Sequence, residues 1–314
     1  MPAPRLRGAY TIMPTPFHDD GRLDEESLAR LTAFLIDKGV DGVTVLGVLG
    51  EAPKLSEAEQ EAVLRVTVAA ADGRIPVYAG ASSGGTDLTV ERAMRALELG
   101  AAGLMVAPIA QGDAAILAHY RALDEALVSV GSDAPIILHD YPATTGVRMS
   151  AELVTRLGDE LPHVTTIKLE DPPTGPKIRA LLRLAGPGDT ADANRLAILG
   201  GLGGTYLVEE MDSGADGVMT GLSFPELLVD VVRAHLAGTD DDRERERQRF
   251  FRAGALLRYE FQPGIGLALR KEIYRRRGAI ASARVRAPGA QIDDDLRREL
   301  DAVLAYVERD AGLA

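Results

Sequence analysis

Residues 42–80 contain two short apolar runs, Gly42-Val-Thr-Val-Leu46 and Pro76–Gly80, separated by the loop Gly47-Val-Leu-Gly-Glu51 and the amphipathic stretch Glu57–Ala71. Short runs rich in β-branched residues predict buried strands, and a longer stretch of helical periodicity predicts a helix. A strand followed by a helix and another strand is the unit that joins parallel strands. This segment therefore predicts an α/β fold with a parallel sheet.

The same alternation recurs along the first 225 residues. The predicted strands are Gly8–Met13, Gly42–Leu46, Pro76–Gly80, Gly103–Ala107, Ile136–Asp140, Thr165–Lys168, Leu196–Gly200 and Gly217–Thr220. The helical patterns between them include Leu23–Lys38, Glu57–Ala71, Asp87–Leu99, Ala114–Val130, Ala151–Leu157 and Tyr206–Ser213. Eight strands in this order predict a parallel (β/α)8 barrel, the TIM-barrel architecture, whose active site lies at the carboxyl ends of the strands.

Strand patterns stop after Phe224, and the last quarter of the chain is helical in pattern. The helices predicted there are Pro225–Leu236, Arg243–Tyr259, Gly264–Arg276 and Asp293–Val307. We therefore expect a barrel over residues 1–225 that carries the active site and a C-terminal helical region over residues 226–314 packed on it.

Composition excludes several classes of function. The 314 residues include no cysteine, so disulfides, thiolate nucleophiles and cysteine-bound metals are excluded. The net charge of −12 argues against a nucleic-acid partner, because phosphate binding requires a basic face. The chain has no apolar run near the roughly 20 residues that span a bilayer and no signal-peptide pattern, so we expect a cytoplasmic protein without a membrane partner. Its five histidines are scattered, and we expect neither a metal nor a cofactor.

Lys168 ends the run Val164-Thr-Thr-Ile-Lys168, at the end of a predicted strand where barrel active sites lie. Strand alternation places it on the same face as Val164 and Thr166. If that face is the barrel interior, burial favours the neutral amine, which can attack a carbonyl and form a Schiff base. The alternative is an exposed or ion-paired lysine, since Glu170 and Asp171 are near enough to pair with it.

Two further loops follow strand ends. In Gly47-Val-Leu-Gly-Glu51 the glycines permit a tight turn whose N–H groups can hold a carboxylate, although a plain strand-to-helix turn has the same composition. After the fifth predicted strand, His139 and Tyr141 share strand parity, and either could transfer protons. A structural role for the lone histidine is the alternative.

These features together resemble the dihydrodipicolinate synthase and N-acetylneuraminate lyase family of class I pyruvate-type aldolases. The resemblance rests on Lys168 in strand six, Gly47-x-x-Gly50-Glu51 after strand two and Pro142…Thr145-Gly146 after strand five. Further matches are Pro16-Phe17…Asp20-Gly21, Ala79-Gly80, Gly100-Ala101 and Gly264…Leu269-Arg270-Lys271, so the resemblance covers essentially the whole chain. It implies a barrel with a C-terminal helical region, commonly tetrameric. It also implies a 2-oxo acid bound as an imine, with its carboxylate on the Val48 and Leu49 amides.

The chain also departs from the family pattern. Val48 and Leu49 stand where the family usually has two hydroxyl residues, so a hydroxyl relay is lost while amide binding survives. His139 stands where the usual catalytic tyrosine is expected, so either His139 or Tyr141 takes the acid–base role. Thr144 replaces the arginine with which the synthase grips aspartate semialdehyde, which argues against lysine biosynthesis.

We therefore predict a cofactor-free class I lyase, an aldolase or a dehydratase, acting on a 2-keto-3-deoxy sugar acid or a related hydroxylated 2-oxo acid. The predicted catalytic residues are Lys168, His139 and Tyr141, and the predicted substrate-binding residues are Gly47, Val48, Leu49, Gly50, Glu51, Thr145, Gly200 and Gly201. Besides this small-molecule substrate, we expect a homo-oligomer, a tetramer or a dimer. The alternatives are a 4-hydroxy-tetrahydrodipicolinate synthase and a non-catalytic member that binds a 2-oxo acid. The glycine run at 200–204 could also bind phosphate.

Overall fold

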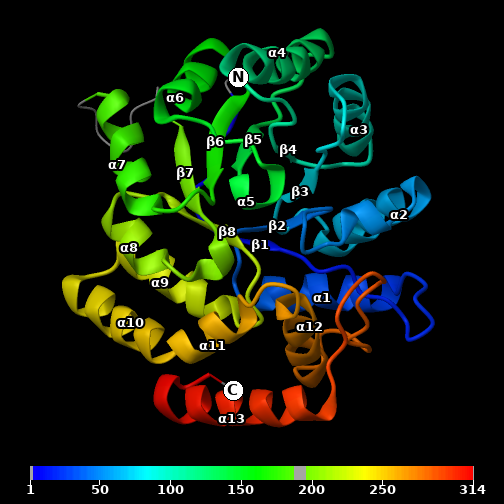
Figure 1. Ribbon diagram of the computed structural model, residues 1–314, viewed down its shortest axis with the longest axis vertical. Coiled ribbons are helices and arrows are strands. Elements are labelled where there is room, and N and C mark those ends of the chain that lie inside the picture. The colour runs from blue at the N-terminus through cyan, green and yellow to red at the C-terminus, as the bar shows by residue number, and fades with distance from the viewer. Residues whose placement is uncertain (1–2, 187–195, 314) are drawn as a thin grey trace.

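The computed structural model describes residues 3–186 and 196–313, and in it eight parallel strands close into a barrel in chain order (Figure 1). The strands are β1 (Gly8–Ile12), β2 (Gly42–Val45), β3 (Val77–Gly80), β4 (Gly103–Val106), β5 (Ile136–Asp140), β6 (Val164–Leu169), β7 (Ala197–Gly200) and β8 (Gly217–Thr220). Each boundary lies within one residue of the predicted one. The predicted (β/α)8 barrel is confirmed.

Helices surround the barrel (Figure 1). They are α1 (Glu25–Asp37), α2 (Glu57–Ala71), α3 (Thr86–Glu98), α4 (Asp113–Ser129), α6 (Ala151–Glu160), α7 (Thr174–Leu184), α8 (Leu207–Asp212) and α9 (Pro225–Ala237). Side chains cap several of them, and in α2 Ser56 and Glu59 form a reciprocal capping box. The helices predicted from the sequence do not include α7, and the residues of the short helix α5 (Pro142–Thr145) are predicted to form a turn.

The C-terminal helices follow α9, which itself packs on β1 and β8. They are α10 (Asp240–Arg252), α11 (Gly254–Glu260), α12 (Gly266–Arg276) and α13 (Asp294–Ala311). The helix predicted over Arg243–Tyr259 is therefore two helices, because the chain turns at Ala253. Helix α13 packs against α10 and α11, which confirms a C-terminal helical region. The division of the chain at residue 225 stays a prediction.

The barrel interior shows which strand residues face inward. A buried cluster inside it includes Ile137 of β5 and Leu199 of β7. Side chains two residues apart on a strand share a face, so His139 lies on the interior face with Ile137. Lys168 pairs in register with His139 on one side and Leu199 on the other. This register places Lys168 on the interior face of the barrel, as predicted.

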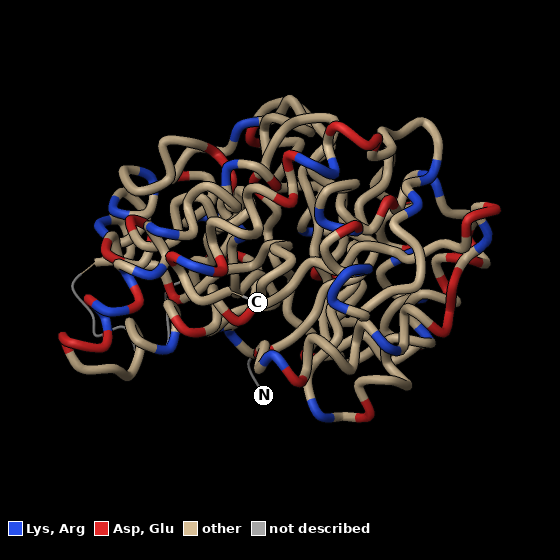
Figure 2. The backbone as a smooth tube through the Cα atoms, turned by 90° about the horizontal axis from the view of Figure 1, so that it is seen from below, with Lys and Arg blue, Asp and Glu red and all other residues tan. Residues whose placement is uncertain are grey.

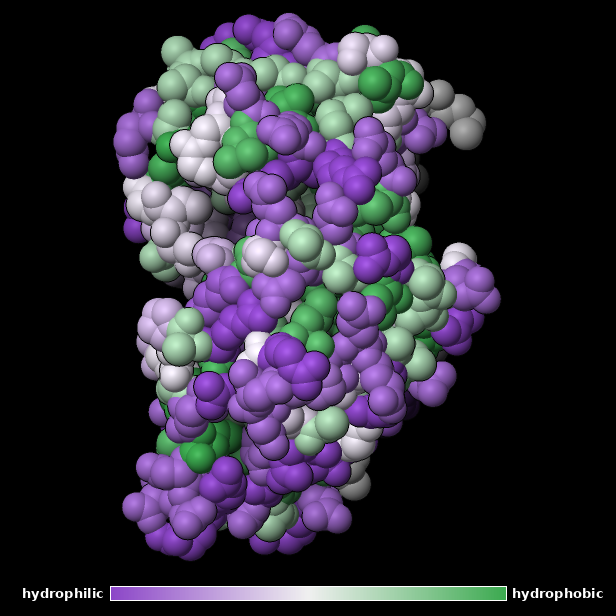
Figure 3. Space-filling model, turned by 90° about the vertical axis from the view of Figure 1, so that its right-hand side faces the viewer, coloured by the Kyte–Doolittle hydropathy of each residue, from purple (hydrophilic) through white to green (hydrophobic). Residues whose placement is uncertain are grey.

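The molecular surface carries mixed charge and mixed hydropathy. Basic and acidic residues are interspersed over the view in Figure 2. On the face shown in Figure 3, apolar residues are scattered among polar ones. Among the residues described, no helix combines the length and the apolar character needed to cross a bilayer.

Candidate active site

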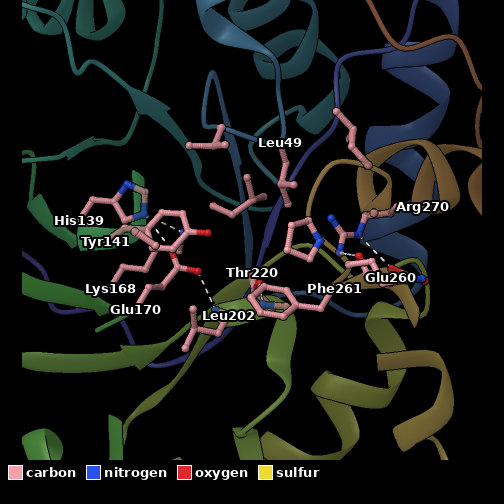
Figure 4. Close-up of a pocket in the computed structure, with 18 of the residues that line it drawn as sticks. Leu49, His139, Tyr141, Lys168, Glu170, Leu202, Thr220, Glu260, Phe261 and Arg270 are labelled. Carbon is pink, nitrogen blue, oxygen red and sulfur yellow. Dashed lines mark hydrogen bonds and ion pairs between the residues drawn. The ribbon is translucent and has the colours of Figure 1, made fainter. Parts of the chain in front are cut away.

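A cavity of about 560 Å³ opens at the carboxyl ends of the strands (Figure 4). The strand ends contribute Ile12, His139, Lys168 and Thr220 to its wall. Apolar and polar side chains from the segment Glu260–Arg270 form the opposite wall. The C-terminal helical region therefore completes the cavity that the barrel begins.

At the bottom of this cavity, Lys168 forms a buried triad with His139 and Glu170. Lys168 is only 5% exposed. Its Nζ donates a hydrogen bond to Oε2 of Glu170 at 2.6 Å and lies 3.1 Å from Nε2 of His139. The same Nε2 lies 2.8 Å from Oε2 of Glu170. Lys168 is thus both buried in the barrel interior and ion-paired, two positions that the sequence presented as alternatives.

The surroundings of the triad lower the pKa values of both Glu170 and His139. Burial by itself would raise the pKa of the Glu170 carboxyl, but the Lys168 ammonium and the His139 hydrogen bond lower it to about 2. Burial and then the Lys168 ammonium lower the pKa of His139, which Glu170 only partly offsets. At neutral pH a carboxylate therefore lies beside a neutral imidazole, a group able to accept a proton.

Glu170 is the main site residue that sequence reasoning did not assign to the site. It was recognised only as an ion-pair partner for Lys168. Its Oε1 accepts the backbone N–H of Leu202 at 2.7 Å, so the loop after β7 holds the carboxylate in place. The available signal was its position two residues after Lys168, which gives it the same strand parity.

Tyr141 lies over His139 and lines the same cavity. The two rings stack with their centroids 5.7 Å apart. The Tyr141 hydroxyl points into the cavity in Figure 4. Burial and then the Glu170 carboxylate raise the pKa of Tyr141, so the phenol keeps its proton at neutral pH. The structure therefore brings together the three residues predicted to be catalytic.

The loop after β2 supplies Val48 and Leu49 to the cavity wall. A turn closes it, in which the Gly50 N–H donates to Gly47 O at 3.0 Å and the Glu51 N–H donates to Val48 O at 3.1 Å. Within the residues that the structure describes, the N–H groups of Val48 and Leu49 donate to no protein acceptor. Both amides therefore keep an unused N–H donor, and the carboxylate site that the resemblance implies stays a prediction.

The side chain of Glu51 does not join this wall. It is buried beneath the loop, where its carboxylate accepts Lys271 Nζ at 2.6 Å and Lys54 Nζ at 2.9 Å. Its second oxygen also accepts the N–H of Arg286 at 3.0 Å. Glu51 thus ties the loop after β2 to the C-terminal region.

Thr145, Gly200 and Gly201 lie around the site rather than in its wall. The Thr145 hydroxyl bonds to the Tyr141 and Val147 carbonyls and so closes the turn after β5. A Cβ on Gly201 would lie 2.3 Å from Cγ of Glu170, and one on Gly200 would lie 1.8 Å from a Glu210 oxygen. These two glycines make room for buried carboxylates, and a role in substrate binding stays a prediction for all three residues.

Arg270 and Glu260 form the other charged pair of the cavity. Arg270 Nε donates to Glu260 Oε2 at 2.9 Å, and both side chains are buried. Arg270 belongs to the sequence match with the family but is not among the predicted site residues. Across the described ranges, no group of three or more histidine, aspartate or glutamate side chains could hold a metal ion.

Comparisons with known proteins agree with this geometry. A model of the dihydrodipicolinate synthetase family matches residues 5–307. The chain is 32% identical over 311 residues to the L-2-keto-3-deoxyarabonate dehydratase of Azospirillum brasilense, covering 96% of this chain and 94% of that protein. It is 31% identical over 304 residues to a 4-hydroxy-tetrahydrodipicolinate synthase of Methanothrix thermoacetophila, covering 95% and 96%.

Among solved structures, the dihydrodipicolinate synthase of Rhodopseudomonas palustris superimposes with a TM-score of 0.88 at 39% identity, covering 97% of this chain and 98% of that one. The family match, the full-length relatives and the superposition span the barrel and the C-terminal helices alike. This chain therefore belongs to the dihydrodipicolinate synthetase family and is a lyase.

Proposed function

We propose that this protein is a class I lyase that removes water from a 2-keto-3-deoxy sugar acid, through an imine between Lys168 and the C2 carbonyl. The observation that carries the proposal is the buried triad: a lysine amine at the bottom of a cavity, 3.1 Å from the imidazole and 2.6 Å from the carboxylate. An amine in this setting can lose its proton locally and attack a bound carbonyl.

The first step needs a neutral amine. In the His139 tautomer with its proton on Nδ1, Nε2 is an acceptor, so the Lys168 ammonium passes a proton to it at 3.1 Å. The N–H formed in this way donates to the Glu170 carboxylate at 2.8 Å. Glu170 stays ionised, because its pKa is held at about 2. The amine then adds to C2, and the His139 imidazolium returns its proton to the carbinolamine hydroxyl, which leaves as water and gives a protonated imine.

The second step removes a proton from C3. His139, neutral again after returning its proton, takes the C3 proton while the C3–H electrons move toward the iminium nitrogen and form an enamine. The substrate carboxylate is held meanwhile by the Val48 and Leu49 amides. The positive nitrogen is what makes the C3 proton acidic enough to leave.

The third step expels the C4 hydroxyl as water. The enamine electrons form the C3–C4 double bond as the C4–O bond breaks, and Tyr141 donates the proton that the leaving oxygen needs. The raised pKa of Tyr141 keeps the phenol protonated, so Tyr141 can supply a proton but is not a base for the C4 hydroxyl. Cleavage of the C3–C4 bond would instead need a base at the C4 hydroxyl. Hydrolysis of the imine releases the product, and His139 returns the C3 proton to Tyr141.

A second candidate is 4-hydroxy-tetrahydrodipicolinate synthase. It is favoured by the 39% identity to the Rhodopseudomonas palustris protein of that description. Thr144, which is exposed in α5, argues against it, because no cationic side chain occupies this position. Family membership also leads us to propose a cytoplasmic homo-oligomer, a tetramer or a dimer.

The test is borohydride trapping with pyruvate, followed by intact mass and peptide mapping. The chain has only five lysines, so a reduced adduct can be assigned to one side chain. We expect the adduct on Lys168 and none in Lys168→Ala. Lys38→Ala is the matched control, because Lys38 is half-buried outside the cavity and pairs with Glu226. Absence of an adduct in the wild type would overturn the imine mechanism.

Product analysis then separates the reaction types. With a 2-keto-3-deoxy sugar acid, we expect loss of water without release of pyruvate. Pyruvate release would identify an aldolase, and condensation of pyruvate with aspartate semialdehyde would identify the synthase. Trapping without turnover of any of these substrates would identify a non-catalytic binding protein.

A further inference from the structure

We infer that Arg270 forms the distal end of the substrate site and that its pairing with Glu260 selects a neutral hydroxylated tail over a second carboxylate. The preferred substrate is then a monocarboxylic 2-keto-3-deoxy sugar acid. This inference rests on the proposed function, because it concerns the far end of a substrate attached to Lys168.

Arg270 lies across the cavity from Lys168 in Figure 4. It belongs to α12 and is only 2% exposed, so its guanidinium meets the cavity rather than bulk solvent. A Cβ on Gly221 would lie 2.6 Å from Leu49 Cδ1 and 3.7 Å from Arg270 Cδ. The glycine therefore lets the loop after β2 approach Arg270, so one ligand can reach both.

The guanidinium has hydrogen-bonding capacity left for a ligand. Its Nε donates to Glu260 Oε2 at 2.9 Å, and its Nη2 lies 3.5 Å from the Glu260 carbonyl oxygen. Within residues 3–186 and 196–313, Nη1 donates to no acceptor. Arginine carries five N–H donors, so an oxygen atom in the cavity can accept from Arg270 without disturbing its pair with Glu260.

A hydroxyl group beside Thr220 would complete the contact. The Thr220 oxygen accepts the Gly203 N–H at 3.0 Å, which leaves its own O–H free to donate. Thr220 lines the cavity with Arg270. A substrate hydroxyl oxygen can accept from both groups.

Charge balance decides against a second carboxylate. The charged side chains among the described residues that line the cavity are Lys168, Glu170, Glu260 and Arg270. Each cation is bonded to one carboxylate, and the two Glu260 oxygens also accept the Ser223 N–H and hydroxyl. A second substrate carboxylate would therefore enter a buried site with no uncompensated positive charge, which is costly. A hydroxyl adds no charge.

The first test compares three substrates on the wild-type enzyme. The reference is a five-carbon 2-keto-3-deoxy acid with hydroxyls on C4 and C5; one analogue lacks the C5 hydroxyl, and a six-carbon analogue ends in a carboxylate. We expect kcat/KM to fall at least about 10-fold for each analogue, the loss that one charge-assisted hydrogen bond represents. Equal or higher kcat/KM for the dicarboxylate would overturn the inference, and this result needs no variant.

The second test uses Arg270→Met and Arg275→Met. Arg275 lies on the same helix and also pairs with a glutamate, Glu272, but lies outside the cavity. Arg270→Met should raise KM for the hydroxylated acid at least about 10-fold and reduce the penalty for removing the C5 hydroxyl to what the Thr220 contact alone contributes. Pyruvate trapping, which does not use the distal end, should change less than about twofold. Arg275→Met should match the wild type in both measurements.

Glu260→Gln removes the anion of the pair, whereas Arg270→Met removes the cation. Removal of the compensating charge should shift the ratio of kcat/KM toward the dicarboxylate by at least about 10-fold. The pair of Arg270 and Glu260 would be structural if Arg270→Met kept normal trapping and an unchanged KM for the hydroxylated acid. Glu260→Gln would then also keep the wild-type ratio of kcat/KM between the two acids. Absence of pyruvate trapping in the wild type would instead refute the proposed function. Failure of this inference and failure of the proposed function are therefore distinguishable.

Discussion

Nζ of Lys271, on α12, lies 2.6 Å from Oε1 of Glu51, at the end of the loop after β2, across 220 residues of sequence. Lys271 also donates to the Arg284 carbonyl oxygen at 2.8 Å and lies 4.5 Å from the centre of the Phe17 ring. This buried contact anchors the proposed carboxylate-binding loop on the C-terminal helical region. The helical region therefore shapes the site from two directions, through Lys271 beneath the loop and through Arg270 in the cavity wall.

Lys271→Met should destabilise the protein by about 1–3 kcal/mol, because the buried Glu51 carboxylate loses its shortest contact and keeps only Lys54 and the Arg286 N–H. Chemical denaturation measures this free energy of unfolding. Lys38→Met, which breaks a longer pair of 3.6 Å between two half-buried side chains, should cost about 1 kcal/mol. The folded Lys271→Met variant should also show a raised KM for pyruvate in trapping. Equal stability of the two variants would contradict the anchoring role.

Tyr141→Phe should separate imine formation from water loss. The variant keeps the Lys168, His139 and Glu170 triad, so pyruvate trapping should remain within about twofold of the wild type. Its rate of water loss should fall by about 10²–10⁴, the usual contribution of one general acid. His139→Gln should instead slow trapping itself. If Tyr141→Phe lost trapping while His139→Gln kept it, the two roles would have to be exchanged.

Glu210 should make stability fall as pH rises. It is fully buried, and this burial raises its pKa from 4.5 to about 8. Between these two values the unfolded chain is ionised at Glu210 while the folded chain keeps its proton, so the folded state loses stability with rising pH. Glu210→Gln should remove this dependence and be more stable than the wild type at pH 8 by roughly 3–5 kcal/mol. Parallel stability–pH curves for the wild type and Glu210→Gln would show that Glu210 does not cause the pH dependence.

Gly201→Ala should impair activity by displacing Glu170. The added Cβ would lie 2.3 Å from Glu170 Cγ and 2.5 Å from its Oε1, so the carboxylate must move away from Lys168. We expect at least about a 10-fold loss of trapping rate and roughly 1–3 kcal/mol of destabilisation. Gly84→Ala is the control, since nothing lies within 4 Å of a Cβ there. Normal trapping with a raised KM for the sugar acid would instead support the predicted substrate contact of Gly201.

The barrel could be predicted from the sequence because its strands and helices are coded locally. Each strand is a run of four to six residues with its own β-branched pattern, and all eight boundaries agree within one residue. The helix predicted over Arg243–Tyr259 was wrong because periodicity does not register a turn between two helices of similar composition. Gly254 lowers the cost of leaving the first helix. Packing against α12 and α13 then sets the direction of the second.

The sequence by itself determined that Lys168 and His139 lie at strand ends and that Tyr141 shares the parity of His139, since parity depends only on neighbours along one strand. Only the tertiary structure decided their partners. Glu170 meets His139 because the sheet places β5 beside β6, and Arg270 reaches the cavity only because α12 folds back over the strand ends. Contacts between residues 30 to 220 positions apart have no local periodicity, so no pattern in the sequence could indicate them.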